Sequence, residues 1–179
     1  AIRAYCLEER LEDVSRVQQL ILQTFADDFA KYRKRVNVGR LRKVFSRIPS
    51  LVGRKLMYVQ IDRNEKARDL SDSVELLAMA RLLHRVRHST GNGLPLAGEA
   101  DDRDFKPLFL DCGLVCSALG LILTQLQIAG DIVLVNDGAL CEQFVGQHLL
   151  YQQPAYMQPD LFCWNRKKRG SAAEVDYLF

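Results

Sequence analysis

Glu174 and Asp176 are two acidic residues whose spacing could bring both carboxylates to one metal ion. They lie in the stretch EVDYLF, whose residue types predict a strand. Because side chains alternate along a strand, residues two apart lie on the same side. Carboxylate oxygens are the ligands that Mg²⁺ prefers. The pair is therefore either half of a magnesium site or the polar positions of an edge strand.

Four further residues are of the types that bind zinc. Cys112 and Cys116 lie one helical turn apart, and His84 and His88 share one face of a predicted strand. The short loop that normally separates paired zinc ligands is absent, so packing in the core is the favoured interpretation. The odd count of five cysteines, without the spacing of a disulfide framework, predicts reduced thiols and a cytoplasmic location.

The middle of the chain is strongly basic. Between Lys31 and Arg68 lie 13 of the 25 basic residues, and the acidic residues there are only Asp62 and Glu65. Such a cluster is typical of a surface that binds a phosphate backbone, so duplex DNA is the predicted partner. A solvated charged face is the alternative.

Composition bounds the class of protein. The chain of 179 residues is 48% hydrophobic and 26% charged, which predicts a globular protein with a core. No run approaches the roughly 18 apolar residues of a membrane span, so we expect no membrane partner. The first residue is Ala1, and the chain ends within a predicted strand, so we interpret it as a piece of a longer protein.

The first half of the chain has the periodicity of several helices followed by a hairpin. Apolar residues at helical spacing predict a long helix over 13–32, with no partner inside the chain. Residues 40–56 predict two short helices, and MYVQI at 57–61 alternates as a strand. A third helix is predicted over 64–83. Two strands, at 82–88 and 105–111, flank a turn that contains Gly-Asn-Gly, with the acidic stretch GEADDRD in the connection.

Three helices followed by a hairpin are the order of a winged helix, in which the third helix enters the major groove. Asp69, Asp72 and Glu75 lie along that helix and would repel phosphate, so a protein-protein spacer is an equal alternative. The predicted nucleic-acid-binding residues are Arg40, Arg42, Lys43, Arg47, Arg54, Lys55, Lys66, Arg68, Arg85 and Arg87.

The remainder of the chain predicts two more helices and a second pair of strands. The helices cover 112–121 and 138–152, with a helical connector at 123–137 between them. The strands lie within 161–179 and are joined by a basic turn that contains glycine. The predicted fold class is therefore α+β and helix-rich.

Three phrases resemble a known family: FKPLFLDCGLVCSALGL, NDGALCEQFVGQHLL and LFCWNRKKRGSAAEVDYLF. Together they resemble the C-terminal region of a prokaryotic family in which an AAA-type ATPase core is followed by a domain of unknown function. The resemblance implies a winged-helix-like module and then a nuclease-like α/β module of the PD-(D/E)xK type. It covers nearly the whole chain.

The resemblance also implies site residues. Glu142 matches the catalytic glutamate of the nuclease-like helix, and Asp176 matches the catalytic aspartate of the hairpin's second strand. With Glu174 they would hold Mg²⁺ for phosphodiester hydrolysis. The Glu-x-Lys strand is expected beyond Phe179, so the site is expected to be incomplete in this chain. No phosphate-binding G-x-x-x-x-G-K-[ST] loop occurs, so ATP would act only through an ATPase core elsewhere.

These observations predict three parts: a linker helix over 1–35, a winged-helix-like module over 36–110, and a truncated nuclease-like domain over 111–179. The leading hypothesis is a DNA-associated module without catalysis or cofactor of its own. One alternative is an interaction module that forms a homo-oligomer or docks on the ATPase core. A second alternative is a Mg²⁺-dependent nuclease in the intact protein.

Overall fold

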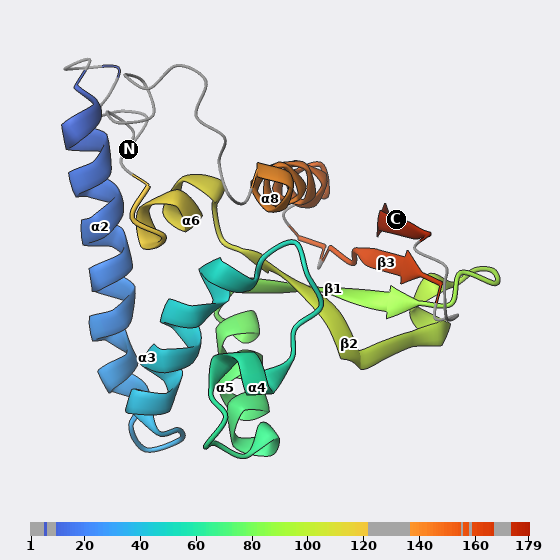
Figure 1. The fold of residues 1–179 in the computed structure, drawn as a ribbon, viewed down its shortest axis with the longest axis horizontal. Helices are drawn as coiled ribbons and strands as arrows, with labels where there is room; N and C mark the ends of the chain where they lie inside the picture. The colour runs from blue at the N-terminus through green and yellow to red at the C-terminus, as the bar shows by residue number, and fades with distance from the viewer. Residues whose placement is uncertain (1–5, 7–9, 122–136, 155, 158, 167–172) are drawn as a thin grey trace.

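A computed structural model describes residues 6, 10–121, 137–154, 156, 157, 159–166 and 173–179 (Figure 1). The fold is α+β and helix-rich, as predicted, and the described strands form one four-stranded sheet. In chain order the elements are α2 (Leu11–Asp28), η1 (Phe29–Tyr32), α3 (Val38–Arg47), η2 (Ile48–Leu51), α4 (Tyr58–Ile61), α5 (Ala67–Met79), β1 (Leu83–Ser89), η3 (Leu96–Glu99), β2 (Ala100–Phe109), α6 (Cys112–Ala118), α8 (Asp137–Tyr151), β3 (Phe162–Asn165) and β4 (Glu174–Leu178).

The long helix α2 belongs to the core of the protein. Its apolar face packs against the main hydrophobic cluster through Ile21, Leu22 and Phe25, and the helix contacts α6. The ring of Phe25 meets Phe45 of α3 edge-on, with the centroids 6.4 Å apart. The prediction that this helix has no partner inside the chain is therefore wrong.

Residues 58–61 form the short helix α4, with Met57 as its N-cap, and the prediction of a strand over 57–61 is wrong. The Gln60 side chain accepts a hydrogen bond from the Met57 N–H at 3.1 Å, which closes the first turn. Ile61 is buried, whereas Met57 and Val59 are about half exposed. In a strand, these three side chains would share one face. A single helical turn instead buries Ile61 alone.

The antiparallel hairpin of β1 and β2 follows α5, as predicted, although β2 begins earlier than expected. Five residues of the acidic stretch GEADDRD lie in the strand, and Asp101 pairs with His88 across the hairpin. Asp104 is buried, and its carboxylate pairs with Lys55 at 2.7 Å. The ion pair explains how an acidic residue lies at a buried strand position.

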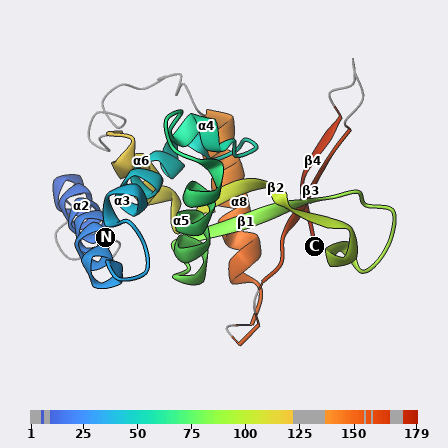
Figure 2. The same cartoon turned by 90° about the horizontal axis from the view of Figure 1, so that it is seen from below.

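The sheet has the strand order β2-β1-β3-β4, with β3 parallel to β1 and antiparallel to β4. Helices α3 and α5 cover one face through the main hydrophobic cluster, and α8 covers the other through Val86, Leu108 and Leu161 (Figures 1 and 2). The strands of the predicted winged-helix-like and nuclease-like modules thus belong to one sheet, which crosses the boundary predicted at residue 110. The predicted connector at 123–137 lies outside the described residues, except for its last residue, which begins α8.

Two buried glutamines attach α8 to the end of β2. The Gln143 side chain accepts a hydrogen bond from the Phe109 N–H and donates one to the Phe109 carbonyl, both at 2.8 Å. One turn later, Gln147 accepts a hydrogen bond from the Cys112 N–H at 2.8 Å. These bonds satisfy backbone groups where β2 ends and α6 begins. They also fix Glu142, the neighbour of Gln143, above the sheet.

Candidate functional site

Three carboxylates converge on the buried side chain of Lys106. This lysine lies on β2 opposite Val86, and its side chain is only 8% exposed. Its Nζ lies 2.7 Å from Asp176 Oδ1 and 3.3 Å from Glu142 Oε2, and it also pairs with Glu174. The cluster therefore joins β2, α8 and β4, which are far apart in the sequence.

The local structure of β4 and α8 explains why the acids meet. Glu174 and Asp176 contact the same lysine because they lie two apart on β4, as the sequence predicted. Tyr177, the residue after Asp176, donates a hydrogen bond from its hydroxyl to the Glu142 carbonyl at 2.7 Å and so ties β4 to α8. A Cβ at Gly146 would lie 2.5 Å from Tyr177 Oη, so this close approach requires glycine.

Electrostatics keeps Lys106 charged. Burial acts to lower the pKa of the Lys106 amine, but the hydrogen bonds to Asp176 and Glu174 raise it above the ordinary lysine value. Burial raises the pKa of Glu142, and the neighbouring ammonium opposes that shift. Lys106 is thus an ammonium at neutral pH and cannot act as a base. With all three acids ionised, the cluster carries an excess of negative charge.

The cluster has the chemistry of a cation site that the protein fills with its own lysine. Within the part of the chain that the structure describes, no group of three or more His, Cys, Asp or Glu residues is arranged to hold a metal ion. The cation that all three acids contact is the ammonium of Lys106. A hard cation such as Mg²⁺ could bind Glu142, Glu174 and Asp176 only if Nζ moved aside.

Sequence reasoning found the acids of this cluster and missed the lysine. It expected the lysine of the nuclease-like site on a strand beyond the end of the chain, whereas Lys106 lies on β2. The available signal was a charged residue inside the apolar run FKPLFL. A lysine in such a run is buried only when it has a partner. The position of that partner could not be predicted without the sheet.

The structure pairs many of the predicted nucleic-acid-binding residues with acids. These ion pairs join residues that are distant in the sequence, and a count of charges along the chain does not show them. The pairs are Arg40 with Glu65 and Asp69, Arg42 with Asp27, Lys43 with Asp62, Lys55 with Asp104, Arg85 with Glu75, and Arg87 with Asp102 and Asp160. The charges of these residues are therefore partly balanced within the protein.

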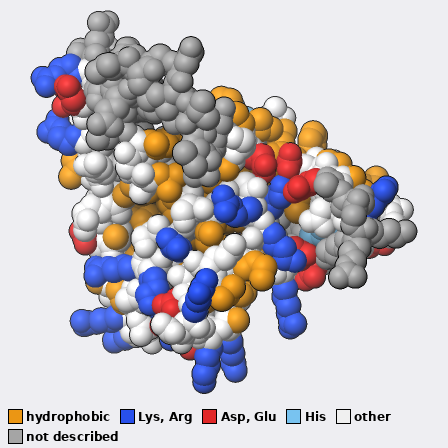
Figure 3. All heavy atoms as spheres, viewed as in Figure 1, with side chains coloured by type: hydrophobic (Ala, Val, Ile, Leu, Met, Phe, Trp, Pro, Cys, Tyr) orange, Lys and Arg blue, Asp and Glu red, His pale blue; other side chains and the backbone are white. Residues whose placement is uncertain are grey.

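The rest of the predicted set keeps its charge available. Arg47, Arg54, Lys66 and Arg68 have no ion pair with any described residue. Arg47 and Arg54, together with Arg63, line a shallow pocket of about 770 Å³ between η2 and α4. Lys and Arg side chains project along the lower margin in Figure 3, in the region where Figure 1 draws α3 to α5. This basic pocket is the second candidate site.

The residues considered for zinc lie on separate elements. His84 and His88 are on β1, while Cys112 and Cys116 are on α6. Burial raises the pKa of both α6 thiols, which disfavours the thiolate that binds zinc. The described cysteines are all free thiols. Of the four side chains, His88 is buried, whereas His84, Cys112 and Cys116 are partly buried.

Comparison with known proteins gives one match. A family model described as a domain of unknown function, DUF8612, matches residues 2–125. The matched part extends from α2 to α6 and includes Lys106 and the basic pocket, whereas α8, β3 and β4 lie outside it. No curated protein and no solved structure matches the chain. The resemblance to an ATPase-associated, nuclease-like family therefore remains a prediction.

Proposed function

We propose that this chain, which belongs to the DUF8612 family of domains of unknown function, is a nucleic-acid-associated module that binds a phosphate backbone on its helical side. The observation that carries the proposal is the basic pocket formed by Arg47, Arg54 and Arg63. We place the protein in the cytoplasm because its described cysteines are free thiols. No described helix has the length and apolar character needed to cross a membrane.

The charge around the basic pocket favours an anionic ligand. The acid that lines it, Asp62, is engaged by Lys43, and Arg47 donates from Nε to the Gln60 carbonyl at 3.2 Å. The guanidinium groups of Arg54 and Arg63 have no ion pair with any described residue. A polyanion that entered this pocket would meet three arginines and one neutralised carboxylate. Phosphate groups match the planar donors of arginine well.

The first prediction concerns DNA affinity. Replacing Arg47, Arg54 and Arg63 together by glutamine should weaken binding to a duplex by at least about tenfold at low salt. It should also reduce the slope of log affinity against log salt by about 3, because each phosphate contact contributes roughly 0.9. Fluorescence anisotropy with a labelled duplex over a salt series measures both quantities.

A matched control removes the same number of positive charges at positions away from the pocket. Arg10, Arg16 and Lys31 are exposed and paired with neighbouring acids, so their joint replacement by glutamine should change the slope little. Equal effects of the two triple variants would contradict a specific site. A concentration-dependent dimer in light scattering, with no DNA binding at low salt, would favour the interaction module instead.

A second candidate function, Mg²⁺-dependent phosphodiester cleavage, is favoured by the convergence of Glu142, Glu174 and Asp176 on Lys106. A bound Mg²⁺ would supply charge stabilisation of the phosphate and activation of a water molecule. The carboxylates would hold it, and the displaced ammonium could orient the water by hydrogen bonding. Asp176 and Glu174 are about half exposed, so the cluster is open to solvent.

The second prediction tests this site with Mn²⁺ as a paramagnetic probe. Mn²⁺ should broaden the NMR signals of Glu142, Glu174 and Asp176 selectively. In Asp176→Asn, the same broadening should require an Mn²⁺ concentration at least about tenfold higher. Asp102→Asn is the control, because Asp102 is exposed and lies outside the cluster. Broadening spread over all acidic residues, or plasmid nicking in Mg²⁺ that survives Asp176→Asn, would exclude the site.

A further inference from the structure

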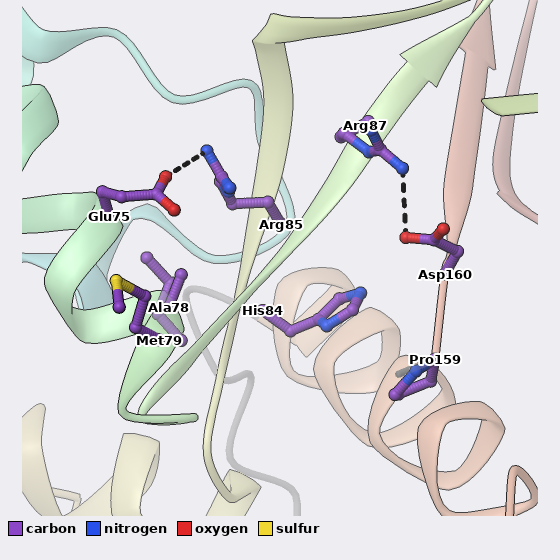
Figure 4. A pocket seen from close by; sticks show the side chains of 9 residues that line it. Glu75, Ala78, Met79, His84, Arg85, Arg87, Pro159 and Asp160 are labelled. Atoms are coloured by element: carbon purple, nitrogen blue, oxygen red, sulfur yellow. Dashed lines mark hydrogen bonds and ion pairs between the residues drawn. The ribbon is translucent and has the colours of Figure 1, made fainter. Parts of the chain in front are cut away.

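A pocket of about 350 Å³ lies beside β1, away from both candidate sites described above. It is bounded by α5 on one side and by the segment before β3 on the other (Figure 4). Glu75 and Met79 line it from α5, His84 and Arg85 from β1, and Asp160 from the opposite wall. Most of these groups are polar or charged.

A second pocket of about 380 Å³ adjoins the first and is mainly apolar. Leu150 and Met157 line it together with Phe109 and Leu110, near the ends of α8 and β2. The two pockets share Ala78, Leu83, His84 and Pro159 as lining residues. Each volume is in the range of small-molecule sites in proteins. The two compartments together offer an apolar region and a polar region to one ligand.

His84, at the junction of the compartments, has an unused hydrogen-bonding group. Its Nε2 is buried and has no hydrogen-bond partner among the described residues. Burial lowers the pKa of His84 to about 4, so the imidazole is neutral at physiological pH. A neutral imidazole offers one donor and one acceptor. Rotation about χ2, which is a soft torsion, can turn either nitrogen towards a ligand.

The charged groups of the polar compartment balance one another. Arg85 pairs with Glu75 at 2.9 Å, and Arg87 pairs with Asp160 at 3.0 Å; Figure 4 shows both pairs across the pocket. A charged group on a ligand would meet no net opposite charge in this compartment. It would also compete with an existing ion pair. An uncharged head that both donates and accepts hydrogen bonds is the better match.

The backbone of β1 supplies further hydrogen-bonding groups. β3 pairs with β1 only at Arg87 and His88, so the edge of β1 before these residues has no strand beside it among the described residues. The Arg87 N–H donates to the Leu161 carbonyl at 3.2 Å on this edge. Because strand geometry repeats every two residues, the N–H and C=O of Arg85 lie on the same edge, beside the pocket.

We propose that the double pocket at His84 binds a small uncharged molecule with an apolar body and an amide-like head. The body occupies the compartment near Leu150 and Met157, and the head pairs with the imidazole and the open edge of β1. An amide carries both a donor and an acceptor, so it matches either tautomer of His84. This site is independent of nucleic-acid binding at the basic pocket.

The test uses benzamide, benzoate and toluene as probes, followed by NMR of the His84 ring and the Leu150 methyl groups. Benzamide should shift both sets of signals saturably with a dissociation constant in the millimolar range, which suits a ligand of about nine heavy atoms. Benzoate lacks the matched neutral head and toluene lacks any head, so both should bind at least about tenfold more weakly.

Variants separate the two compartments. His84→Leu should weaken benzamide by about tenfold and leave toluene unchanged, whereas Met157→Lys should weaken both probes. His148→Leu is the control, because His148 is exposed on α8 and lines neither pocket. Absence of a saturable shift, equal affinity for toluene and benzamide, or unchanged benzamide binding by His84→Leu would each overturn the proposal.

Discussion

Replacing Lys106 by methionine is expected to lower the free energy of unfolding by about 3 kcal/mol, because three carboxylates then lose the cation that they share. Methionine keeps most of the apolar stem, so the packing against the α8 side of the sheet changes little. The largest part of this cost comes from the unpaired carboxylate of Glu142, since Glu142 is the least exposed of the three acids. Urea unfolding followed by circular dichroism measures the loss.

Two controls separate the cluster from ordinary surface charge. Lys31→Met removes an exposed lysine that pairs with Asp28 at 2.7 Å, and it should cost less than about 0.5 kcal/mol. Adding Glu142→Gln to Lys106→Met should recover part of the stability, because it removes one unpaired buried charge. A Lys106→Met protein as stable as the parent would show that the cluster is a solvent-screened surface network.

The same variant links stability to the proposed cation site. Without the ammonium, Glu142, Glu174 and Asp176 form an open group of oxygen ligands. Millimolar Mg²⁺ should therefore stabilise Lys106→Met more than the parent protein, since a ligand that binds only the folded state raises its stability. Equal stabilisation of both proteins would indicate that the acids cannot hold the ion even when the lysine is gone.

The acidic part of the cluster could be predicted because it depends on local periodicity. Glu174 and Asp176 lie two apart in a short strand, and this spacing alone places them on one side. Glu142 lies on a helix whose position depends on contacts made by distant residues. It entered the prediction through the family resemblance rather than through periodicity. Its contact with Lys106 follows from the attachment of α8 to β2.

Lys106 and the ion pairs of the basic region could not be predicted because they depend on pairing across the chain. Lys55 meets Asp104 only after the hairpin returns beside η2, and Arg87 meets Asp160 across 73 residues of the sequence. A local charge count treats such residues as unpaired. Part of the basic region is therefore paired with acids, and Arg47, Arg54 and Arg63 line one pocket without an ion pair to any described residue.

The division of the chain into modules shows a similar limit. The order of helices and hairpin strands followed from apolar periodicity, and the described residues have that order except at α4, where a strand was predicted. The pairing of β3 with β1 joins residues 162 and 163 to residues 87 and 88. Periodicity specifies which residues face a core, but it contains no information about which strand lies beside which. For this reason, the pairing of all four strands in one sheet could not be predicted from the sequence.

Replacing Gln143 by leucine is expected to lower the free energy of unfolding by about 3 kcal/mol. The side chain is fully buried and satisfies both the N–H and the carbonyl of Phe109, which lies in the core. Leucine has a similar size but offers neither a donor nor an acceptor, so both backbone groups would be left without partners. Urea unfolding measures the total loss, and hydrogen exchange at the Phe109 amide reports the specific site.

Two comparisons distinguish this backbone role from general packing. Gln147→Leu should cost less, about 1–2 kcal/mol, because it removes one bond to the backbone at Cys112 in a less enclosed place. Gln23→Leu on the exposed side of α2 should change stability by less than about 0.5 kcal/mol. Because Gln143 adjoins Glu142, its loss should also weaken Mn²⁺ broadening at the carboxylate cluster. Unchanged exchange at Phe109 in Gln143→Leu would show that α8 is held to the sheet by apolar contacts alone.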